Sequence, residues 1–456
     1  MTTCTSRAAW GNLLRRLHFY VGLFVGPFIF FAALTGTLYV ATPQLENALY
    51  WHALHTDSVG EPQPLAEQIA VAEKTVGSEL RLHAVRPGLV EGETTRVMFA
   101  DPTLGPSEHR AIFVDPVNLA VLGDLTVYGT SGILPLRQTI DYLHTSLMLG
   151  DAGRLYSELA ASWMWVAALG GIALWCYTRP KRRINNRFQN RRRVHVTLGW
   201  ALLGGMLLFS ATGLTWSQWA GGNVDKLRAE MNWLTPQVNT TLSGVPESVD
   251  EHAEHHSHHG GMMMSEMAMD LTQFDGVLSA ARKAGIDASK LEIRPAQTAD
   301  RAWTVTEIDR SWPTQVDAVA VDPHTMQVLD RTRFEDFPLM AKLTRWGVDF
   351  HMGILFGLVN QLLLVVFGLA LCVLIIWGYR MWWMRRPAQS TVSPVQTLCQ
   401  SWLALPGWGR GITVLISLLL GIALPVMGVS LALFVLVDWL RWRAATGVSL
   451  AESSAK

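Results

Sequence analysis

The sequence lacks several signatures that define common classes of redox protein. It has no C-x-x-C-H motif, which excludes a covalently attached c-type haem. It also has no G-x-G-x-x-G loop after a strand and no Walker lysine loop, so reduced nicotinamide or flavin is not expected to bind this chain. Only four cysteines are present, and none lies in the two long polar regions that we place outside the membrane below. A disulfide framework is therefore not expected.

Charged residues are scarce as well. They make up 16% of the 456 residues, whereas half of all residues are hydrophobic. Such a chain is too apolar for an ordinary soluble protein and too long for one domain. It is predicted to be an integral membrane protein with soluble parts, and its formal net charge of zero implies no nucleic-acid partner.

The basic residues gather in short loops, most densely in a loop between two apolar segments. Lys and Arg are favoured in cytoplasmic loops, so this loop is predicted to lie in the cytoplasm. The side of the membrane on which every other segment lies then follows by counting spans from this loop. Its basic residues are Arg179, Lys181, Arg182, Arg183, Arg187, Arg191, Arg192 and Arg193.

The segments on either side of this loop alternate across the membrane. The first apolar run is long enough to cross a hydrocarbon core of about 30 Å, which favours an uncleaved span over a signal peptide. Strand-like alternation in the first polar region predicts a small α+β domain on the outer face. In order, the predicted segments are the cytoplasmic N-terminus with the first span (1–41), the first outer domain (42–135), the segment of His144 with the second span (136–178), the basic loop (179–193), the third span (194–217), the second outer region (218–340) and the segment of His351 with the fourth span (341–380).

The remainder of the chain adds a further apolar segment. A cytoplasmic linker (381–407) leads to an apolar run at 408–441 that is long for one helix and has Pro425 in its middle. Proline interrupts helices, so a hairpin of two short spans is predicted, followed by a cytoplasmic tail (442–456). One long tilted helix is the alternative.

Two stretches of the sequence repeat at a fixed offset. His18 in RRLHFYVGLFVG corresponds to His195 in RRVHVTLGWALLG, and 195 − 18 = 177. Later landmarks share a larger offset, since 351 − 144 = 207 for the two outer histidines. The difference, 207 − 177 = 30, indicates a net insertion in the second copy. Landmarks that carry the two offsets are Thr35-Gly36 with Thr212-Gly213, Asp115-Pro116 with Asp322-Pro323, and Arg179-Pro180 with Arg386-Pro387; Arg86-Pro87 and Arg294-Pro295 are 208 apart.

Two copies with the same orientation should be related by an approximate two-fold axis along the membrane normal. Equivalent residues then face each other, His18 with His195 near the inner face and His144 with His351 near the outer face. Two histidines facing across a helix bundle suit haem iron with two axial imidazoles. The sequence therefore predicts haem b at these histidines, one group for each pair.

Other roles for these histidines remain open. Each alone could be a structural or interfacial residue. A tetrahedral zinc site needs about four close ligands, and two histidines are available at each level. A catalytic histidine would need a nearby carboxylate or nucleophile, and Asp141 and Asp349 lie near the outer pair in the sequence. The arginines next to the inner pair could bind haem propionates or could only set the topology; they are Arg15, Arg16, Arg192 and Arg193.

The insertion in the second copy contains a tract rich in histidine and methionine, at 252–269. Imidazole suits Cu(II), Ni(II) or Zn(II), and thioether suits Cu(I), so this tract is a candidate copper site. A low-complexity insertion with incidental metal affinity is the alternative. The residues that could bind metal are His252, His255, His256, His258, His259, Met262, Met263, Met264, Met267 and Met269.

Taken together, these motifs resemble the PepSY-associated transmembrane family. The resemblance covers roughly 10–387 and is carried by LHFYVGLFVG with LTG, the outer strands with Asp-Pro, YLHTSLMLGDAGRL, and DFHMGILFG before an exit rich in Trp and Arg. It implies a mainly α protein of the bacterial inner membrane with duplicated pairs of transmembrane helices and two periplasmic PepSY-like α+β domains, to which the C-terminal helical hairpin is added. Members include iron-regulated proteins and FoxB-type siderophore reductases, which carry haem between their helices.

The leading hypothesis is a haem protein that passes electrons across the membrane to a periplasmic ferric siderophore. A quinol or a cytoplasmic partner would supply the electrons. A reductase of copper or another periplasmic metal is one alternative. A non-redox regulatory or binding protein is another, because PepSY-type domains elsewhere resemble protease-inhibiting modules. A transporter finds little support, because the sequence of the spans shows no charged chain and no broken helix at mid-membrane depth.

The topology can be tested with reporter fusions. Because the basic residues flank the inner ends of the predicted spans, a fusion after residue 90 or 280 should be active only in the periplasm, and one at residue 186 only in the cytoplasm. A fusion at the C-terminus distinguishes six spans from five. Periplasmic activity there would rule out the two-helix interpretation of 408–441.

Overall fold

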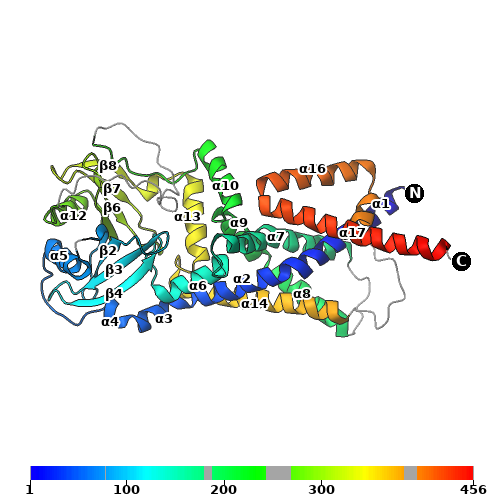
Figure 1. The fold of residues 1–456 in the computed structure, drawn as a ribbon, viewed down its shortest axis with the longest axis horizontal. Coiled ribbons are helices and arrows are strands. Elements are labelled where there is room, and N and C mark those ends of the chain that lie inside the picture. The colour runs from blue at the N-terminus through cyan, green and yellow to red at the C-terminus, as the bar shows by residue number, and fades with distance from the viewer. Residues whose placement is uncertain (1, 78, 179–186, 243–268, 385–397, 455–456) are drawn as a thin grey trace. The chain divides into compact units, whose positions relative to one another are not determined.

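The computed structural model describes residues 2–77, 79–178, 187–242, 269–384 and 398–454 (Figure 1). The chain divides into two compact units, each built from separate stretches. The helical unit consists of Met1–Tyr39, Asp141–Met231 and Leu362–Lys456. The sheet unit consists of Val40–Ile140 and Asn232–Gln361.

The sheet unit contains one antiparallel sheet of eight strands, in the order β4-β3-β2-β1-β5-β6-β7-β8. The two outer regions, expected as separate domains, instead contribute four strands each to this single sheet. The junction is the pairing of β1 with β5, where Val85 lies opposite Ile293. The strands are β1 (Arg81–Arg86), β2 (Thr95–Ala100), β3 (Glu108–Val114), β4 (Val121–Tyr128), β5 (Leu291–Arg294), β6 (Trp303–Glu307), β7 (Ala318–Val321) and β8 (Val328–Thr332).

The strand order is symmetric about the β1–β5 junction. Each half is a meander of four strands in which every strand pairs with the next one in sequence. At the junction 293 − 85 = 208, the same offset that separates Arg86-Pro87 from Arg294-Pro295. Equivalent positions of the two outer regions therefore meet at the centre of the sheet.

Two helices pack on the sheet and share one core. Helix α5 (Leu65–Val76) belongs to the first region and α12 (Gln273–Lys283) to the second. Ile69 and Phe274 are fully buried in the same apolar cluster, which includes strand residues from both halves. The carboxylate of Asp275 accepts the backbone N–H groups of Leu65 at 3.0 Å and Ala66 at 3.4 Å, so α12 caps the start of α5. A continuous core explains why the two regions form one unit.

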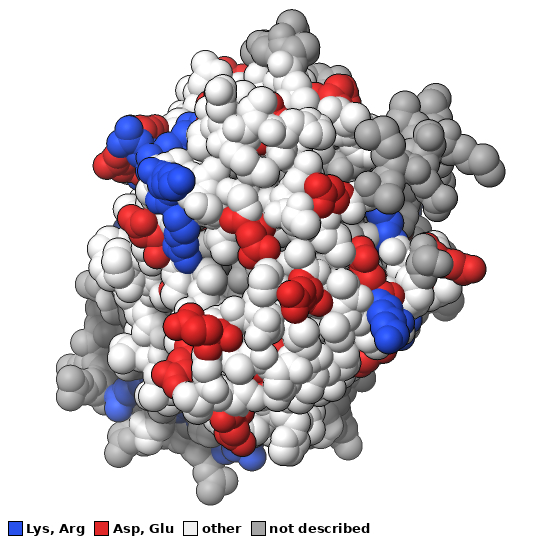
Figure 2. Space-filling model, turned by 90° about the vertical axis from the view of Figure 1, so that its left-hand side faces the viewer, with Lys and Arg blue, Asp and Glu red and all other residues white. Residues whose placement is uncertain are grey.

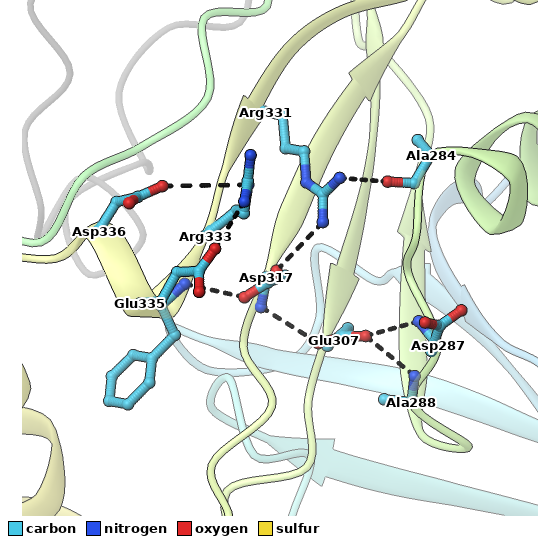
Figure 3. A network of polar contacts seen from close by, with 10 residues as sticks. Ala284, Asp287, Ala288, Glu307, Asp317, Arg331, Arg333, Glu335 and Asp336 are labelled. Carbon is cyan, nitrogen blue, oxygen red and sulfur yellow. Dashed lines mark hydrogen bonds and ion pairs between the residues drawn. The ribbon is translucent and has the colours of Figure 1, made fainter.

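A polar network fixes the part of the second half that leads into the following helix (Figure 3). Glu307, 4% exposed, accepts the backbone N–H groups of Asp287 at 2.8 Å and Ala288 at 2.9 Å. Asp317 accepts the N–H of Phe334 at 2.8 Å, at the first residue of the short helix η2 (Phe334–Asp336). This anchor sets the path of the chain into α13 (Leu339–His351).

The helical unit makes this a multi-pass membrane protein. Among the described residues, four helices are long and apolar enough to cross a membrane: Arg7–Val40, Gly150–Tyr177, Gly357–Met384 and Pro425–Arg443. A fifth span exists if Phe188–Ala201 and Leu203–Thr215, bent by 56°, count as one. The elements that contribute to this unit are α1 (Thr2–Tyr20), η1 (Val21–Val25), α2 (Gly26–Val40), α6 (Pro135–Ser146), α7 (Gly150–Tyr177), α8 (Arg187–Ala201), α9 (Leu203–Thr215), α10 (Trp219–Glu230), α14 (Gly357–Met384), α15 (Leu398–Leu403), α16 (Gly407–Ala423) and α17 (Pro425–Ser454). Helices α3 (Thr42–Leu49) and α4 (Trp51–Leu54) belong to the sheet unit.

The C-terminal helices pack against the rest of the helical unit. Helices α16 and α17 meet at Leu424, directly before Pro425. The carboxylate of Asp438, 1% exposed, accepts hydrogen bonds from the hydroxyl of Tyr20 and, at 2.9 Å, from the backbone N–H of Cys399. A charged residue buried within a span needs such partners. Asp438 therefore links α17 to α1 and to α15.

A buried ion cluster lies beside the junction of the sheet. Glu292 of β5 bonds Arg86 of β1 at 2.7 Å and Arg294 at 2.8 Å. Burial alone would raise the pKa of Glu292, but the two guanidinium groups lower it to about 2. The cluster therefore stabilises the fold above the ordinary Glu pKa of about 4.3, and this contribution is lost as the pH falls towards 2.

Replacement of Glu292 tests this cluster. We expect Glu292→Gln to destabilise the sheet unit by about 3 kcal/mol, because two buried guanidinium groups would lose their counter-charge. Hydrogen exchange at the amides of β1 and β5 measures the effect. Between pH 5 and pH 3 the wild-type protein should lose protection there and the variant should change less. Equal acid sensitivity of the two proteins would contradict the assignment.

Candidate functional site

The inner pair of histidines comes together in the helical unit. His18 lies on α1 and His195 on α8. Their ring centroids are 6.4 Å apart, and the ring planes cross at 72°. The sequence repeat predicted that these two residues face each other, and the structure places the rings at this short separation.

The orientation of His195 is fixed by a backbone carbonyl. Its Nδ1 lies 3.0 Å from the carbonyl oxygen of Leu374 on α14. A ring that donates from Nδ1 to a carbonyl keeps Nε2 as the basic nitrogen, which is the usual arrangement of a metal-bound histidine. For His18, the backbone of Ala167 lies beside the ring, but its buried Nδ1 has no hydrogen-bond partner of good geometry within the described residues.

Each inner histidine lies close to a glycine of a neighbouring helix. A Cβ atom on Gly171 of α7 would lie 3.0 Å from Cε1 of His18, and one on Gly378 of α14 would lie 3.6 Å from Cε1 of His195. The two glycines are related by the second repeat offset, since 378 − 171 = 207. The absence of a side chain at Gly171 therefore allows the imidazole to approach the backbone of α7 closely.

The helix of each inner histidine is irregular at the same distance beyond it. The π-helical segment η1 spans Val21–Val25, so its last residue is seven positions after His18. Leu202, seven positions after His195, separates α8 from α9 where the chain bends by 56°. Interruptions of the regular hydrogen-bond ladder often accompany functional sites in helices and turn the following residues. Val25 is fully buried at this point and Leu202 is 7% exposed.

The spacing of the inner pair is compatible with two imidazoles that would hold one haem iron. A metal–imidazole bond is about 2.0 Å long and the ligating nitrogen lies about 1.1 Å from the ring centroid, so two rings on opposite sides of one metal have centroids about 6.2 Å apart. The observed 6.4 Å agrees with this spacing. Within the described ranges, no group of three or more His, Cys, Asp or Glu side chains could hold a metal ion, so the donor set at this level is two imidazoles.

The outer histidines are described in different units. His144, on α6, belongs to the helical unit, where the Thr35 hydroxyl lies 3.1 Å from its Nδ1. Burial lowers the pKa of His144 to about 4, which keeps the ring neutral as a metal ligand must be. A Cβ on Gly36 would lie 3.1 Å from its Cε1, so His144 packs on a glycine as His18 does. His351 ends α13 in the sheet unit, and its pairing with His144 stays a prediction.

Asp349, two residues before His351, is committed to an ion-pair network. It is fully buried, and its Oδ1 accepts the Nε–H of Arg310 at 2.6 Å, while Arg345 lies 3.5 Å away. Burial raises the pKa of Asp349, although both arginines favour its ionised form. A catalytic role as a base, which the sequence left open, would require this carboxylate to give up its arginine partners.

The same network holds the loop that precedes α6. Arg310 also donates to the hydroxyl of Ser131 at 2.6 Å, and Arg86 donates to the carbonyls of Thr130 at 2.7 Å and Ser131 at 3.0 Å. Arg96 donates to the carbonyl of Gly132 at 2.7 Å. Arg310 therefore links the loop before the helix of His144 to the end of the helix of His351, and Arg86 and Arg96 hold the same loop. Sequence reasoning did not identify them, because isolated arginines in a polar region carry no periodic signal.

The structure describes the arginines next to the inner pair and one residue of the His/Met tract. Arg192 donates to the hydroxyl of Thr178 at the end of α7 at 2.6 Å, and Arg15 donates to Asn12 within α1 at 3.2 Å, so both have protein partners. Of the His/Met tract, only Met269 is described, and it packs against the core of the sheet unit. His252, His255, His256, His258, His259, Met262, Met263, Met264 and Met267 lie outside the described residues.

A family model described as the PepSY-associated TM region matches residues 15–385. This range contains both members of the inner pair and both outer histidines, and it ends before α15. A comparison with curated proteins finds no match.

The contact between His18 and Gly171 can be tested by adding a methyl group. We expect Gly171→Ala to displace the His18 ring by a few tenths of an ångström, which would alter the optical and EPR spectra of any haem held by His18. Gly170→Ala is the matched control, because a Cβ there has open space within 4 Å. Identical spectra for both variants would show that the close approach to α7 does not position the ligand.

Proposed function

Because the chain belongs to the PepSY-associated transmembrane family, whose model matches residues 15–385, we propose that it is a haem-containing electron-transfer protein of the inner membrane that reduces periplasmic ferric siderophores. The observation that carries the proposal is the inner pair of histidines. The ring centroids are 6.4 Å apart and the Leu374 carbonyl orients one of the rings, and two such imidazoles form a donor set suited to haem iron.

The residues around the inner pair would hold the group and control its surroundings. Haem ligated by two imidazoles supplies reversible one-electron transfer when it is bound. His18 and His195 would be its axial ligands, and the Leu374 carbonyl would keep Nε2 of His195 directed to the metal. Val21 and Val25, both fully buried beyond His18, exclude water from this part of the bundle.

A second haem at His144 and His351 is proposed from the sequence repeat. The offset of 207 relates these residues to each other as the offset of 177 relates His18 to His195. Support from the helical unit is the environment of His144, which is buried and neutral, with its ring beside the hydroxyl of Thr35 and packed on Gly36. With ligands near each end of the spans, the N-terminus would lie in the cytoplasm and the sheet unit in the periplasm.

The electron donor and acceptor follow from what the sequence offers. The chain has no motif for reduced nicotinamide or flavin, so a quinol or a cytoplasmic protein is the proposed donor. Figure 2 shows a face of the molecule on which acidic side chains lie at several places and basic side chains lie mostly toward the edges. Such a face attracts cationic metal complexes, which suits a reductase of metal chelates.

Copper is the second candidate substrate. The His/Met tract at 252–269 supplies ligands for both oxidation states of copper and belongs to only one of the two copies. A copper reductase would use the same histidine pairs and differ only in the complex that is reduced. A non-redox PepSY-type regulatory protein is the remaining alternative, and it predicts no haem.

Single histidine variants test the proposal. We expect the purified protein to show the reduced bands of haem b, and His18→Ala or His195→Ala to remove one haem while His144→Ala or His351→Ala removes the other. His324→Ala, an exposed histidine in a turn, is the control and should keep the full haem content. The ratio of haem to protein and the redox titration of each variant measure the outcome.

Two results would contradict the proposal. A wild-type protein without haem bands would leave the non-redox alternative, and full haem content in all four variants would show that other residues are the ligands. The substrate is decided by mixing the reduced protein anaerobically with a ferric siderophore or with Cu(II), with and without residues 252–269. Oxidation by Cu(II) alone, lost on removal of the tract, would identify copper as the substrate.

A further inference from the structure

Helix α13 has an exposed apolar face that the fold of the sheet unit leaves uncovered. Leu339, Met340 and Leu343 are 67%, 38% and 48% exposed. They are spaced at i, i+1 and i+4 and therefore lie on one side of the helix. The opposite side packs inward, with Ala341 1% exposed and Asp349 fully buried.

Aromatic residues extend this face towards the next helix. Trp312 is 58% exposed, and its ring centroid lies 5.6 Å from that of Trp346 on α13 and 6.2 Å from that of Phe356. The backbone N–H of Trp312 donates to the carbonyl of Leu355 at 2.8 Å, which holds the segment against the start of α14. Phe356 is itself 51% exposed.

The exposed apolar surface formed by Leu339, Met340, Leu343, Trp312 and Phe356 leads directly into a membrane-spanning helix. Phe356 is followed by Gly357, the first residue of the span Gly357–Met384. Leu358 and Val359, at the start of this span, are 60% and 72% exposed and face outward from the sheet unit. The surface of α13, Trp312 and Phe356 is thus continuous with a surface that must contact lipid.

We propose that α13 is an interfacial helix whose apolar face, with Trp312 and Phe356, lies in the headgroup region of the bilayer next to the start of α14. Tryptophan favours this region because its ring is apolar and its N–H is polar. Trp346 satisfies its N–H by donating to the hydroxyl of Thr314 at 3.2 Å.

One basic residue of α13, Lys342, lies at the margin of the apolar face, whereas Arg345 lies on the opposite side with Asp349. Lys342 donates to the carbonyl of Glu335 at 2.7 Å, and the side chain of Arg345 is 37% exposed beside Asp349. Long basic side chains at the margin of an apolar face extend towards water and lipid phosphates. A second copy of the chain could also cover an apolar face, but continuity with the span favours lipid as the occupant.

This inference stands apart from the proposed redox function and has a consequence for it. His351 is the last residue of α13, so an interfacial helix places this histidine at the depth of the lipid headgroups. A ligand there would lie at the boundary between the hydrocarbon core and the outer aqueous phase. A protein without haem would still have α13 at the interface.

Site-specific labels in the full-length protein test the inference. A fluorescent label is attached at Leu343→Cys in a background without other cysteines, and the protein is placed in nanodiscs. We expect quenching by lipids brominated near the headgroup and little quenching by iodide, because the label would be shielded from water. Met340→Cys provides a second position on the same face should the first variant fold poorly.

Two reference positions calibrate the result. A label at Val359→Cys in the span should be quenched by brominated lipid, and one at Val59→Cys, 81% exposed before α5, should be quenched by iodide alone. Labels on α13 that behave like the label at Val59 would overturn the proposal. Labels shielded from both quenchers would also overturn it, because a protein partner would then cover the face.

Discussion

Close approach between an imidazole ring and a helix backbone sets the arrangement of the helical unit. His18 lies near Gly171, His195 near Gly378 and His144 near Gly36, and a Cβ at these glycines would stand 3.0, 3.6 and 3.1 Å from the Cε1 atom of the ring. Each of these rings is thus held against the backbone of a neighbouring helix. The π-helical segment η1 follows His18, and the chain bends by 56° at the break between α8 and α9 that follows His195.

The sheet unit depends instead on ion pairs and hydrogen bonds that join buried charged residues of its two halves. Glu292 joins β1 to β5 through Arg86, and Arg86 also holds the loop that enters α6. Arg310 holds the same loop and the end of α13 through Asp349. The charged groups thus connect the starts and ends of the helices that carry the outer histidines, and they do so within one unit.

The sequence predicted some of these features and could not predict others. The family, the membrane character and the approach of His18 to His195 followed from apolar runs and from the offset between two similar segments. The single sheet did not follow, because alternation shows which residues face the core but not which distant strand is the neighbour. Gly171 could have been found, since its offset from Gly378 equals that of the outer histidines, whereas nothing in the pattern identified Arg310 as the partner of Asp349.

The symmetric junction of β1 and β5 also bears on how such a chain could arise. A chain with one copy would leave β1 as an open edge, and two identical chains would close it through the self-complementary contact typical of homodimers. Joining the copies in one chain replaces association between molecules with a permanent connection. It also frees the copies from identity, so that one outer region could gain about 30 residues, including the His/Met tract, while the other kept its original length.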